Sequence, residues 1–417
     1  MKKNFKLREY QEQISKDASL ILDKYGFVYL AMQVRTGKTH TALNIAHTRG
    51  KESVLFVTKK KAIYSIQEDY EMIDAGFKMM IVNYESIHKV PRESYDMVIL
   101  DEAHGMGAFP KPSKRAVEVK DMIDSCFDAE VIFLSGTPTP ESYSQIYHQL
   151  WVLGPLSPFA GYKNFYAWAK SYVNIKQKRI GGLVVNDYTE ADAKLVEDSL
   201  KPYTMSFTQS EAGFHSYIEE EVLTVEAPEI VRGIAKRLKK DRVVEGKDEV
   251  ILADTGAKLM NKMHQIYSGT VKFESGKSMV ISPYKAEFIK RHFAGKKIGI
   301  FYKFVEELNA IVDVFGEENI TSDVAEFDST NKSIALQVVS GREGISLRNA
   351  EALVFYNIDY SATSYWQARD RMTTKDRKYN KVYWVFSDCG IERKIYKVVN
   401  EKKTFTLSHF EKELLSL

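Results

Sequence analysis

Short apolar runs recur through the first 150 residues, with polar or helix-forming stretches between them. These runs lie at 27–32, 53–57, 79–82, 97–100 and 131–134. Each is short enough for a strand that is buried on both faces. Strands of this kind that alternate with helices predict a parallel sheet covered by helices. The pattern therefore predicts an α/β lobe over residues 1–154.

Apolar runs of the same kind return near the end of the chain, at 298–302, 334–339, 352–358 and 382–386. They predict a second α/β lobe over residues 291–417. The stretch between the lobes, residues 155–290, contains aromatic-rich helical segments such as "NFYAWAKSYV" and longer polar connections. We therefore expect the α/β class, with two parallel-sheet lobes and a largely helical insertion between them.

Three polar clusters directly follow apolar runs of the first lobe. They are "GKT" at 37–39, "DEAH" at 101–104 and "SGTP" at 135–138. The carboxyl ends of parallel strands share one edge of the sheet, and ligands bind there. A Gly-Lys-Thr between a buried strand and a helix start forms a phosphate-binding loop, because backbone N–H groups and the helix dipole point at the anion. Two carboxylates at the same edge suit Mg²⁺ binding and activation of water.

The phosphate loop departs from the full pattern at two positions. Met32 stands where a Gly is expected five residues before Gly37, and Arg35 stands where many such loops carry another Gly. A second Gly-Lys-Ser occurs at 276–278, between two short β-prone runs. That copy is predicted to be a hairpin turn without a nucleotide.

Length and composition narrow the class of protein. A chain of 417 residues has room for two domains or more. The sequence has no run of about 18 apolar residues and no apolar segment behind its N-terminal lysines, so neither a membrane span nor a secretory signal is expected. Cys126 and Cys389 lie far apart in sequence, which argues against a zinc ribbon and suggests a reducing cytoplasm. The net charge of +3 leaves the partner open.

The polar clusters also carry a resemblance to a known family. "GKT" at 37–39 resembles motif I of superfamily 2 helicases and translocases, "DEAH" resembles motif II, and "LSGTPTP" from Leu134 resembles motif III. The text that follows, "ESYSQIYHQLWVLGP", is similar to that of Swi/Snf-type ATP-dependent DNA translocases. Further segments resemble the adenine-side motif and motifs Ib, IV, V and VI, in that order: "LREYQ" (7–11), "IVNYESI" (81–87), "IGIFYKF" (298–304), "VVSGREGISLRNAEALVFYNIDYS" (338–361) and "YWQARDR" (365–371). The ordered set spans nearly the whole chain and implies two RecA-like lobes, in a compact motor of phage or bacterial type.

The resemblance implies ATP and Mg²⁺ as cofactors and gives a role to each matching residue. The expected catalytic residues are Lys38, Glu102, Gln367 and Arg371, the last as an arginine finger. The expected nucleotide-binding residues are Arg8, Gln11, Thr36, Gly37, Lys38, Thr39 and Gly344. Thr39 and Asp101 would hold the metal, and Ser135 and Thr137 would couple nucleotide state to nucleic acid. The expected nucleic-acid contacts are Lys59, Lys60, Tyr84, Lys303 and Arg342.

Motif VI departs from the family pattern. The family commonly has a second arginine three residues after the first, and this chain has Thr374 there. Either Arg369 or Arg377 takes that role, or one finger is enough.

Two basic segments have alternative interpretations. Lys59, Lys60 and Lys61 either contact phosphates or form a solvated helix start, the usual fate of a charge run. The segment "KQKRIGG" at 176–182 is predicted to be a basic hairpin tip. That tip either presses on DNA at a junction or is a solvated turn.

The resemblance implies an ATP-dependent motor on double-stranded or branched DNA, which would translocate, migrate branches, regress forks or reanneal strands. The nearer alternative is a helicase that separates strands of RNA or DNA. A more distant alternative is a DNA-binding module that has lost turnover. The expected partner is DNA, with RNA possible and no membrane. A monomeric motor in the cytoplasm of a bacterium or a phage-infected host is expected.

Overall fold

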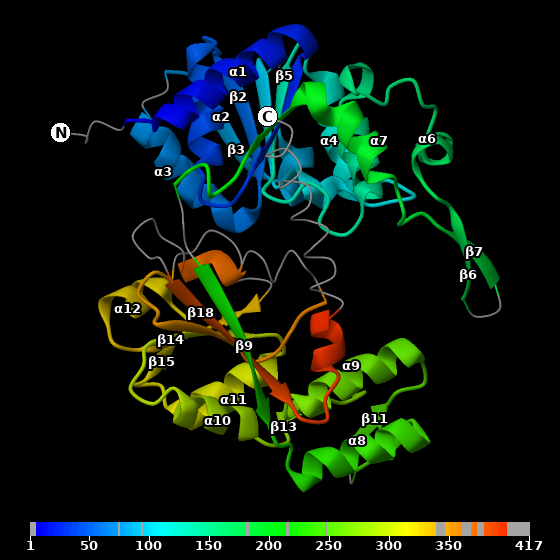
Figure 1. Cartoon of the computed structure of the whole chain (residues 1–417), viewed down its shortest axis with the longest axis vertical. Coiled ribbons are helices and arrows are strands. Elements are labelled where there is room, and N and C mark those ends of the chain that lie inside the picture. Colours follow the sequence, from blue (N-terminus) through cyan, green and yellow to red (C-terminus); the bar gives the residue numbers. More distant parts are fainter. Residues whose placement is uncertain are drawn as a thin grey trace. The chain divides into compact units, whose positions relative to one another are not determined.

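The computed structural model describes residues 6–73, 76–92, 95–180, 183–213, 217–246, 248–338, 347–360, 368–372 and 379–397. The chain divides into two compact units (Figure 1). The first contains the described residues up to Gly213, and the second contains those from Tyr217 onward.

The first unit is built on a six-stranded sheet in which every strand pairing is parallel. The strand order is β3-β2-β4-β5-β1-β8. The strands are β1 (Phe27–Met32), β2 (Ser53–Thr58), β3 (Lys78–Asn83), β4 (Met97–Asp101), β5 (Glu130–Leu134) and β8 (Thr204–Phe207). All six residues of β1 are buried, as expected for a strand covered on both faces. The five strands predicted for this part of the chain are confirmed.

Successive residues of β1 point to opposite sides of the sheet. Val28, Leu30 and Met32 belong to one apolar cluster and Phe27 and Tyr29 to another. The first cluster is completed by α1 (Glu9–Tyr25), α2 (Lys38–Thr48) and α3 (Ile63–Ile73). The second is completed by α4 (Lys114–Ser125), α5 (Ile146–Trp151), α6 (Phe165–Tyr172) and α7 (Ala193–Leu200). Helices therefore cover both faces of the sheet.

Helix α1 delivers the chain directly into the central strand β1. Its buried residues Ile14, Ala18 and Leu22 recur every four positions and so form one apolar stripe. The helix ends at Gly26, which has a φ of 68° and whose N–H donates to the Leu22 carbonyl at 2.8 Å. Glycine adopts this left-handed conformation at little cost, which allows the sharp turn into β1.

The second unit also has a six-stranded, wholly parallel sheet, in the order β15-β16-β14-β17-β18-β9. The strands are β9 (Tyr217–Val225), β14 (Ile298–Tyr302), β15 (Ile320–Thr321), β16 (Ser333–Gln337), β17 (Ala352–Phe355) and β18 (Tyr379–Ser387). From β14 the chain passes to β15 and then β16, which lie on one side of β14. It then crosses to β17 on the other side. The carboxyl ends of β14 and β17 thus form a topological switch point, where open α/β sheets bind ligands.

The helices that accompany this sheet include α8 (Glu229–Asp241), α9 (Gly256–Tyr267), α10 (Tyr284–His292), α11 (Val305–Phe315) and α12 (Val324–Ser329). The first four contribute to one apolar cluster with the strands. Two small antiparallel hairpins, β10 (Val243–Glu245) with β11 (Val250–Leu252) and β12 (Thr270–Lys272) with β13 (Ser278–Val280), complete the unit. The second Gly-Lys-Ser lies at the turn of the β12–β13 hairpin, so the hairpin predicted there is confirmed. The fold class, α/β with two parallel-sheet lobes, is confirmed as well.

Residues 155–290 do not form a body of their own. The stretch up to Gly213 belongs to the first unit, where β8 pairs with β1. The stretch from Tyr217 belongs to the second unit, where β9 pairs with β18 along nine residues. The segment thus supplies an edge strand to each sheet besides its helices. The division expected at 154 and 290 therefore differs from the two units of the structure.

A separate hairpin is formed by β6 (Lys176–Ile180) and β7 (Leu183–Asp187). It is a two-stranded sheet of its own, and Figure 1 shows it reaching away from the helices of the first unit. Leu183 and Val184 are 72% and 54% exposed. The predicted hairpin is thus present, and it exposes apolar as well as basic side chains. Of the helices described, none has the length and apolar character needed to cross a membrane.

Candidate functional site

The predicted phosphate loop connects β1 to the first residue of α2. Gly37 caps the helix with a φ of 82°, and a Cβ at this position would lie 2.2 Å from Nε2 of Gln11. Glycine is therefore favoured there by its conformation, and a side chain would also displace the Gln11 amide. Arg35 also has a positive φ, 66°, so the loop keeps a left-handed turn where many such loops place another Gly. The first backbone N–H groups of α2 are thus left for an anion at the carboxyl edge of the sheet.

Residues from the start of α1 brace this loop from one side. The Gln11 amide donates to the Gly37 carbonyl at 3.2 Å, and its oxygen accepts from the Arg8 backbone at 2.9 Å. The Tyr10 hydroxyl donates to the Thr36 carbonyl at 3.0 Å. The structure therefore brings together Arg8, Gln11, Thr36 and Gly37, which the sequence placed in one nucleotide site.

The segment after β8 braces the loop from the other side. The Gln209 backbone donates to the Gln33 side chain at 2.8 Å, and its amide donates to the Val34 carbonyl at 2.9 Å. The Gln33 backbone in turn donates to the Phe207 carbonyl at 2.9 Å. Sequence reasoning missed Gln209, because no motif marks it and its contacts lie 175 and 176 residues away in the chain.

Asp101 ends β4, and the pKa of its carboxyl group is perturbed. Its Oδ2 accepts from the Thr58 hydroxyl at 2.8 Å. Burial and, to a lesser degree, the charge of Glu102 raise the pKa of Asp101 to about 6, while Lys38, Thr58 and Lys59 act in the opposite direction. Keeping this carboxylate charged therefore costs more than it does in water, and a cation beside it would lower that cost. Lys38, whose amine donates to the Gln33 carbonyl at 3.4 Å, is half-buried in the same region.

A chain of polar contacts links Glu102 to the end of β5. Glu102 has a φ of 52°, and its Oε2 lies 3.3 Å from Nδ1 of His104. The same ring nitrogen lies 3.0 Å from the Ser135 hydroxyl, which accepts from the Thr137 backbone at 3.1 Å. The two residues predicted to couple nucleotide state therefore contact the predicted water-activating carboxylate through one histidine.

Tyr84 is not an exposed nucleic-acid contact, which corrects the prediction for its side chain. It is 1% exposed, and its hydroxyl donates to the Asp101 carbonyl at 2.6 Å. The guanidinium of Arg115 lies 4.8 Å from the centre of its ring. Tyr84 belongs to the core that positions the end of β4, because a buried phenol needs a hydrogen-bond partner and finds one in that strand.

The donor set at this edge fits a magnesium ion that arrives with a nucleotide. Thr39 and Asp101 offer a hydroxyl and a carboxylate, the hard oxygen ligands that Mg²⁺ prefers. Within the described ranges, no cluster of three or more His, Cys, Asp or Glu side chains is present. Since Mg²⁺ is usually held by one or two carboxylates together with water and substrate phosphates, such a cluster is not needed.

The residues predicted from motifs V and VI are described only in part. Arg371 lies in a short 3₁₀ helix, η7 (Asp370–Met372), and its carbonyl accepts from the Leu347 backbone at 2.8 Å. Arg369 is bound to Glu220 at 3.0 Å, so this candidate for the second finger already has a carboxylate partner. Gly344, Gln367, Arg342, Thr374 and Arg377 lie outside the described residues.

Lys303 does not present a free charge for phosphate. Its amine lies 2.6 Å from Oδ1 of Asp359 and 4.8 Å from the centre of the Tyr360 ring, and its side chain is 15% exposed. The predicted phosphate contact is therefore neutralised within the second unit, where the loops after β14 and β17 meet.

Basic side chains are exposed elsewhere. Lys60 begins the 3₁₀ helix η1 (Lys60–Ala62), next to Lys59 at the end of β2. Lys60 and Lys61 are exposed, so the helix-start interpretation and phosphate contact both stay open. Sequence reasoning missed a larger group on α8 and its cap, which we call the α8 cation face: Lys236, Lys239, Lys240, Arg237 and Arg242.

The α8 cation face differs from Lys303 in its lack of neutralisation. All five side chains are exposed, and no ion pair joins them to any residue that the structure describes. Residues three and four positions apart lie on one side of a helix, so Lys236, Lys239 and Lys240 are neighbours. The sequence signal was the run "KRLKKDR", which net charge alone conceals.

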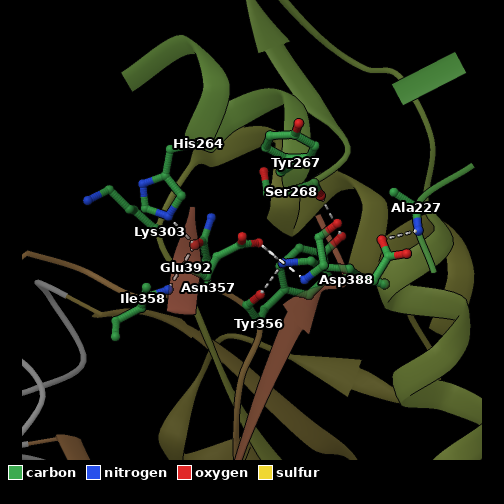
Figure 2. A network of polar contacts seen from close by, with 12 residues as sticks. Ala227, His264, Tyr267, Ser268, Lys303, Tyr356, Asn357, Ile358, Asp388 and Glu392 are labelled. Carbon is green, nitrogen blue, oxygen red and sulfur yellow. Dashed lines mark hydrogen bonds and ion pairs between the residues drawn. The ribbon is translucent and has the colours of Figure 1, made fainter. Parts of the chain in front are cut away.

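A buried polar network lies at the carboxyl ends of β14 and β17 (Figure 2). Lys285 and Glu392 form a 2.8 Å ion pair in which both side chains are fully buried. The Asn357 amide donates to Glu307 at 2.6 Å, and its oxygen lies 2.5 Å from Nε2 of His264. Burial lowers the pKa of His264 to about 3, so its ring is neutral. These groups satisfy most of one another's hydrogen bonds, but Nδ1 of His264 and Oε2 of Glu392 are buried without a partner among the described residues.

Comparison with known proteins gives little at the level of sequence. No family model matches the chain, and no curated protein matches it. Among solved structures, it is similar to a Sulfolobus solfataricus SWI2/SNF2 ATPase core in complex with dsDNA. That match covers 97% of this chain and 92% of the other, with 15% sequence identity and a TM-score of 0.42.

Proposed function

We propose that this chain is an ATP hydrolase that works as a motor on double-stranded or branched DNA. One observation carries the nucleotide chemistry. The Gly-Lys-Thr loop, braced from α1 and from the segment after β8, opens α2 at the same sheet edge where β4 ends in Asp101 and Glu102. The ordered motifs of the sequence support a superfamily 2 motor, and the α8 cation face supports a polyanionic partner.

The residues of the first unit would divide the reaction among them. Lys38 and the loop N–H groups would hold the phosphates, with Arg8 and Gln11 beside the adenine. Thr39 and Asp101 would hold Mg²⁺, which when bound neutralises charge on the phosphate oxygens. Glu102, oriented by His104, would accept a proton from the attacking water.

Two further roles complete the proposal. Ser135 would report nucleotide state because it contacts His104 and, through it, Glu102, and Thr137 would join this chain through its backbone N–H, which donates to Ser135. Arg371 would act on the charge that develops in the transition state. The motor would work as a monomer.

The nucleic-acid contact we propose follows exposed, unneutralised cations. The α8 cation face and Lys60 would contact backbone phosphates, which positions a duplex without reading its bases. Binding should weaken steeply as salt rises, because phosphates recover their counterions.

A phosphate-release assay over a panel of nucleic acids tests the proposal. The panel holds plain duplex, forked and four-way DNA, single-stranded DNA, and RNA of equal length. We expect the largest stimulation of ATP hydrolysis by duplex or branched DNA, with Lys38→Ala as the inactive control. Stimulation by RNA alone would overturn the DNA assignment. If ATP is not hydrolysed with any of these nucleic acids, the chain would instead be a DNA-binding module without turnover.

A strand-separating helicase is the second candidate, and the β6–β7 hairpin favours it. Its basic residues are partly neutralised, since Lys176 pairs with Glu190 at 2.5 Å and Lys178 pairs with Asp187. The exposed aliphatic side chains Leu183 and Val184 are therefore the larger feature of the hairpin, and apolar wedges of this kind can unstack base pairs. Separation of a forked duplex by the wild type, abolished in Leu183→Ser with ATP hydrolysis retained, would favour the helicase.

A further inference from the structure

A cavity of about 360 Å³ lies in the second unit, beside the carboxyl end of β14. Its walls come from α9, from the β12–β13 hairpin, from the segment that follows β14, and from the end of β16. This place adjoins the switch point between β14 and β17, where open parallel sheets take ligands. The volume lies within the range of about 300–1,000 Å³ that small-ligand pockets occupy.

Gln265 of α9 is the unusual residue of this cavity. Its side chain lines the wall and is only 8% exposed, yet its Oε1 has no hydrogen-bond partner among the residues described. A buried acceptor without a partner is unfavourable, and such groups in native proteins call for an explanation. The oxygen itself is fully buried, so a ligand that donates an N–H to it would turn the amide toward the cavity and provide that explanation.

The other walls define the shape and charge of that ligand. Phe304 and Val305 give an apolar side, and the Phe304 ring is held edge-to-face by His264 at 5.4 Å. Glu306 adds a negative charge, and the amine of Lys303 is already paired with Asp359. A phosphate group is therefore a poor occupant of the interior, while a flat, uncharged ring with an N–H donor at its edge fits.

The geometry points to a site for one unpaired nucleobase that carries an exocyclic amino group. We propose that the base comes from the strand on which the chain acts, so this inference rests on the proposed function. Gln265 would accept from the amino group, as glutamine does with adenine, and Phe304 would stack on the ring. Lys272, exposed on the cavity wall, would contact the adjoining phosphate.

Duplexes with a single-nucleotide bulge test the site on the full chain, without ATP. We compare an adenine bulge, a thymine bulge, which lacks the amino group, and an abasic bulge. Wild type should bind the adenine bulge about tenfold more tightly than the abasic one, the factor expected from one stacked and hydrogen-bonded base. Thymine should fall between them, and the fluorescence of a 2-aminopurine bulge should be quenched on binding.

Gln265→Leu should remove most of the preference for adenine over thymine and leave plain-duplex binding unchanged. The fold should tolerate it, because the amide oxygen has no described partner to lose. Asn261→Ala, at an exposed position of the same wall, gives a second variant that should lower the preference less. Gln67→Leu, an exposed glutamine paired with Glu71 on α3, is the matched control.

The outcomes separate this site from the motor itself. Equal wild-type affinity for the three bulges, or full preference in both Gln265→Leu and Asn261→Ala, would overturn the base site even if duplex DNA stimulates ATP hydrolysis. Quenching of a free 2-aminopurine nucleotide but not of the 2-aminopurine bulge would do the same, since the ligand would then be a free nucleotide. If the chain binds none of these duplexes and ATP hydrolysis ignores them, both proposals fail together.

Discussion

The two sheets carry similar residues at their carboxyl edges but treat their charges differently. At the first edge, Asp101 is half-buried and desolvation raises its pKa to about 6, so its carboxylate is not fully compensated by its neighbours. At the second edge, Lys303 is paired with Asp359, and Lys285 with Glu392. The first edge is therefore suited to receive a charged ligand, whereas the second has already used its charges to hold loops together.

The difference teaches how to interpret a charged residue at a strand end. A buried charge must be paired, hydrogen-bonded or neutralised by a ligand. Where the protein supplies the partner, the residue is structural, even if the sequence predicts a functional role for it. Where the protein leaves the charge uncompensated, a binding role is favoured. Variants at the two edges should accordingly fail in different ways.

The largest expected effect is on catalysis at the first edge. Lys38→Ala or Glu102→Gln should reduce ATP turnover below detection, because one holds the phosphates and the other activates water, an effect of at least about 10²-fold for a general base alone. Neither group packs in the core, so the melting temperature should change little. Phosphate release and thermal unfolding monitored by circular dichroism measure the two quantities. Near-normal hydrolysis by either variant would contradict the assignment of this edge.

Arg371→Ala should come next, with a loss of turnover of roughly 10³-fold and retained ATP binding, since a finger acts mainly on transition-state charge. Thr374→Ala should have a much smaller effect. Hydrolysis rate and binding of a fluorescent ATP analogue separate the two properties. A dispensable Arg371 beside an essential Thr374 would mean that motif VI has been aligned incorrectly.

At the second edge, the same kind of substitution should instead lower the stability of the folded protein. Glu392→Gln leaves Lys285 buried without its counter-charge, which should cost about 3–5 kcal/mol of stability. Chemical denaturation followed by tryptophan fluorescence gives the free energy of unfolding. The double variant Lys285→Met with Glu392→Leu should recover much of the loss, because it removes both charges. Loss of activity without loss of stability in Glu392→Gln would mean that this edge, too, is a ligand site.

The α8 cation face should affect affinity more than stability. Alanine at Lys236, Lys239 and Lys240 should lower duplex affinity and reduce the slope of log K against log salt by about 0.9 for each phosphate that the variant no longer neutralises. Lys258→Ala on the neighbouring α9 is the matched control, because that lysine is exposed but paired with Asp254 at 2.9 Å. Fluorescence anisotropy at several salt concentrations measures both. An equal effect of Lys258→Ala would show that pairing does not decide which lysines bind.

The sequence predicted the sheets better than their edge strands. Continuous apolar runs mark strands buried on both faces, and these were found within a few residues of their observed bounds. Strand β9 was missed because its centre is "EEE". One of these glutamates, Glu220, is bound by Arg369 and by the indole of Trp384, partners that lie about 150 residues further along the chain. A pattern based on neighbouring residues has no access to such partners.

The candidate site shows the same limit. Strand order brings the loop after β1 and the end of β4 to one edge, so their association was predictable from alternating strands and helices. The burial of Tyr84 and the pairing of Lys303 were not, because each depends on one distant partner, Asp101 or Asp359. The motifs thus predicted which residues lie near the sheet edges. They did not predict whether contacts with other residues leave those side chains exposed and unpaired.

The smallest predicted effect concerns pH and the buried network of the second edge. His264 faces Asn357, Lys303 and Asp359, and burial together with the charge of Lys303 lowers its pKa to about 3. A histidine whose folded pKa lies below its unfolded value of 6.5 contributes its full stability above pH 6.5. That contribution falls as the pH drops toward 3, by about 1.4 kcal/mol for each pH unit.

Thermal unfolding at pH 7.5, 6.5 and 5.5 should therefore show the wild type losing stability across this range. His264→Gln should reduce the loss, because glutamine keeps a polar group near Asn357 and takes up no proton. Identical profiles for His264→Gln and the wild type would mean that the second edge does not hold its histidine neutral, and the contrast between a compensated and an uncompensated edge would lose its clearest titrating group.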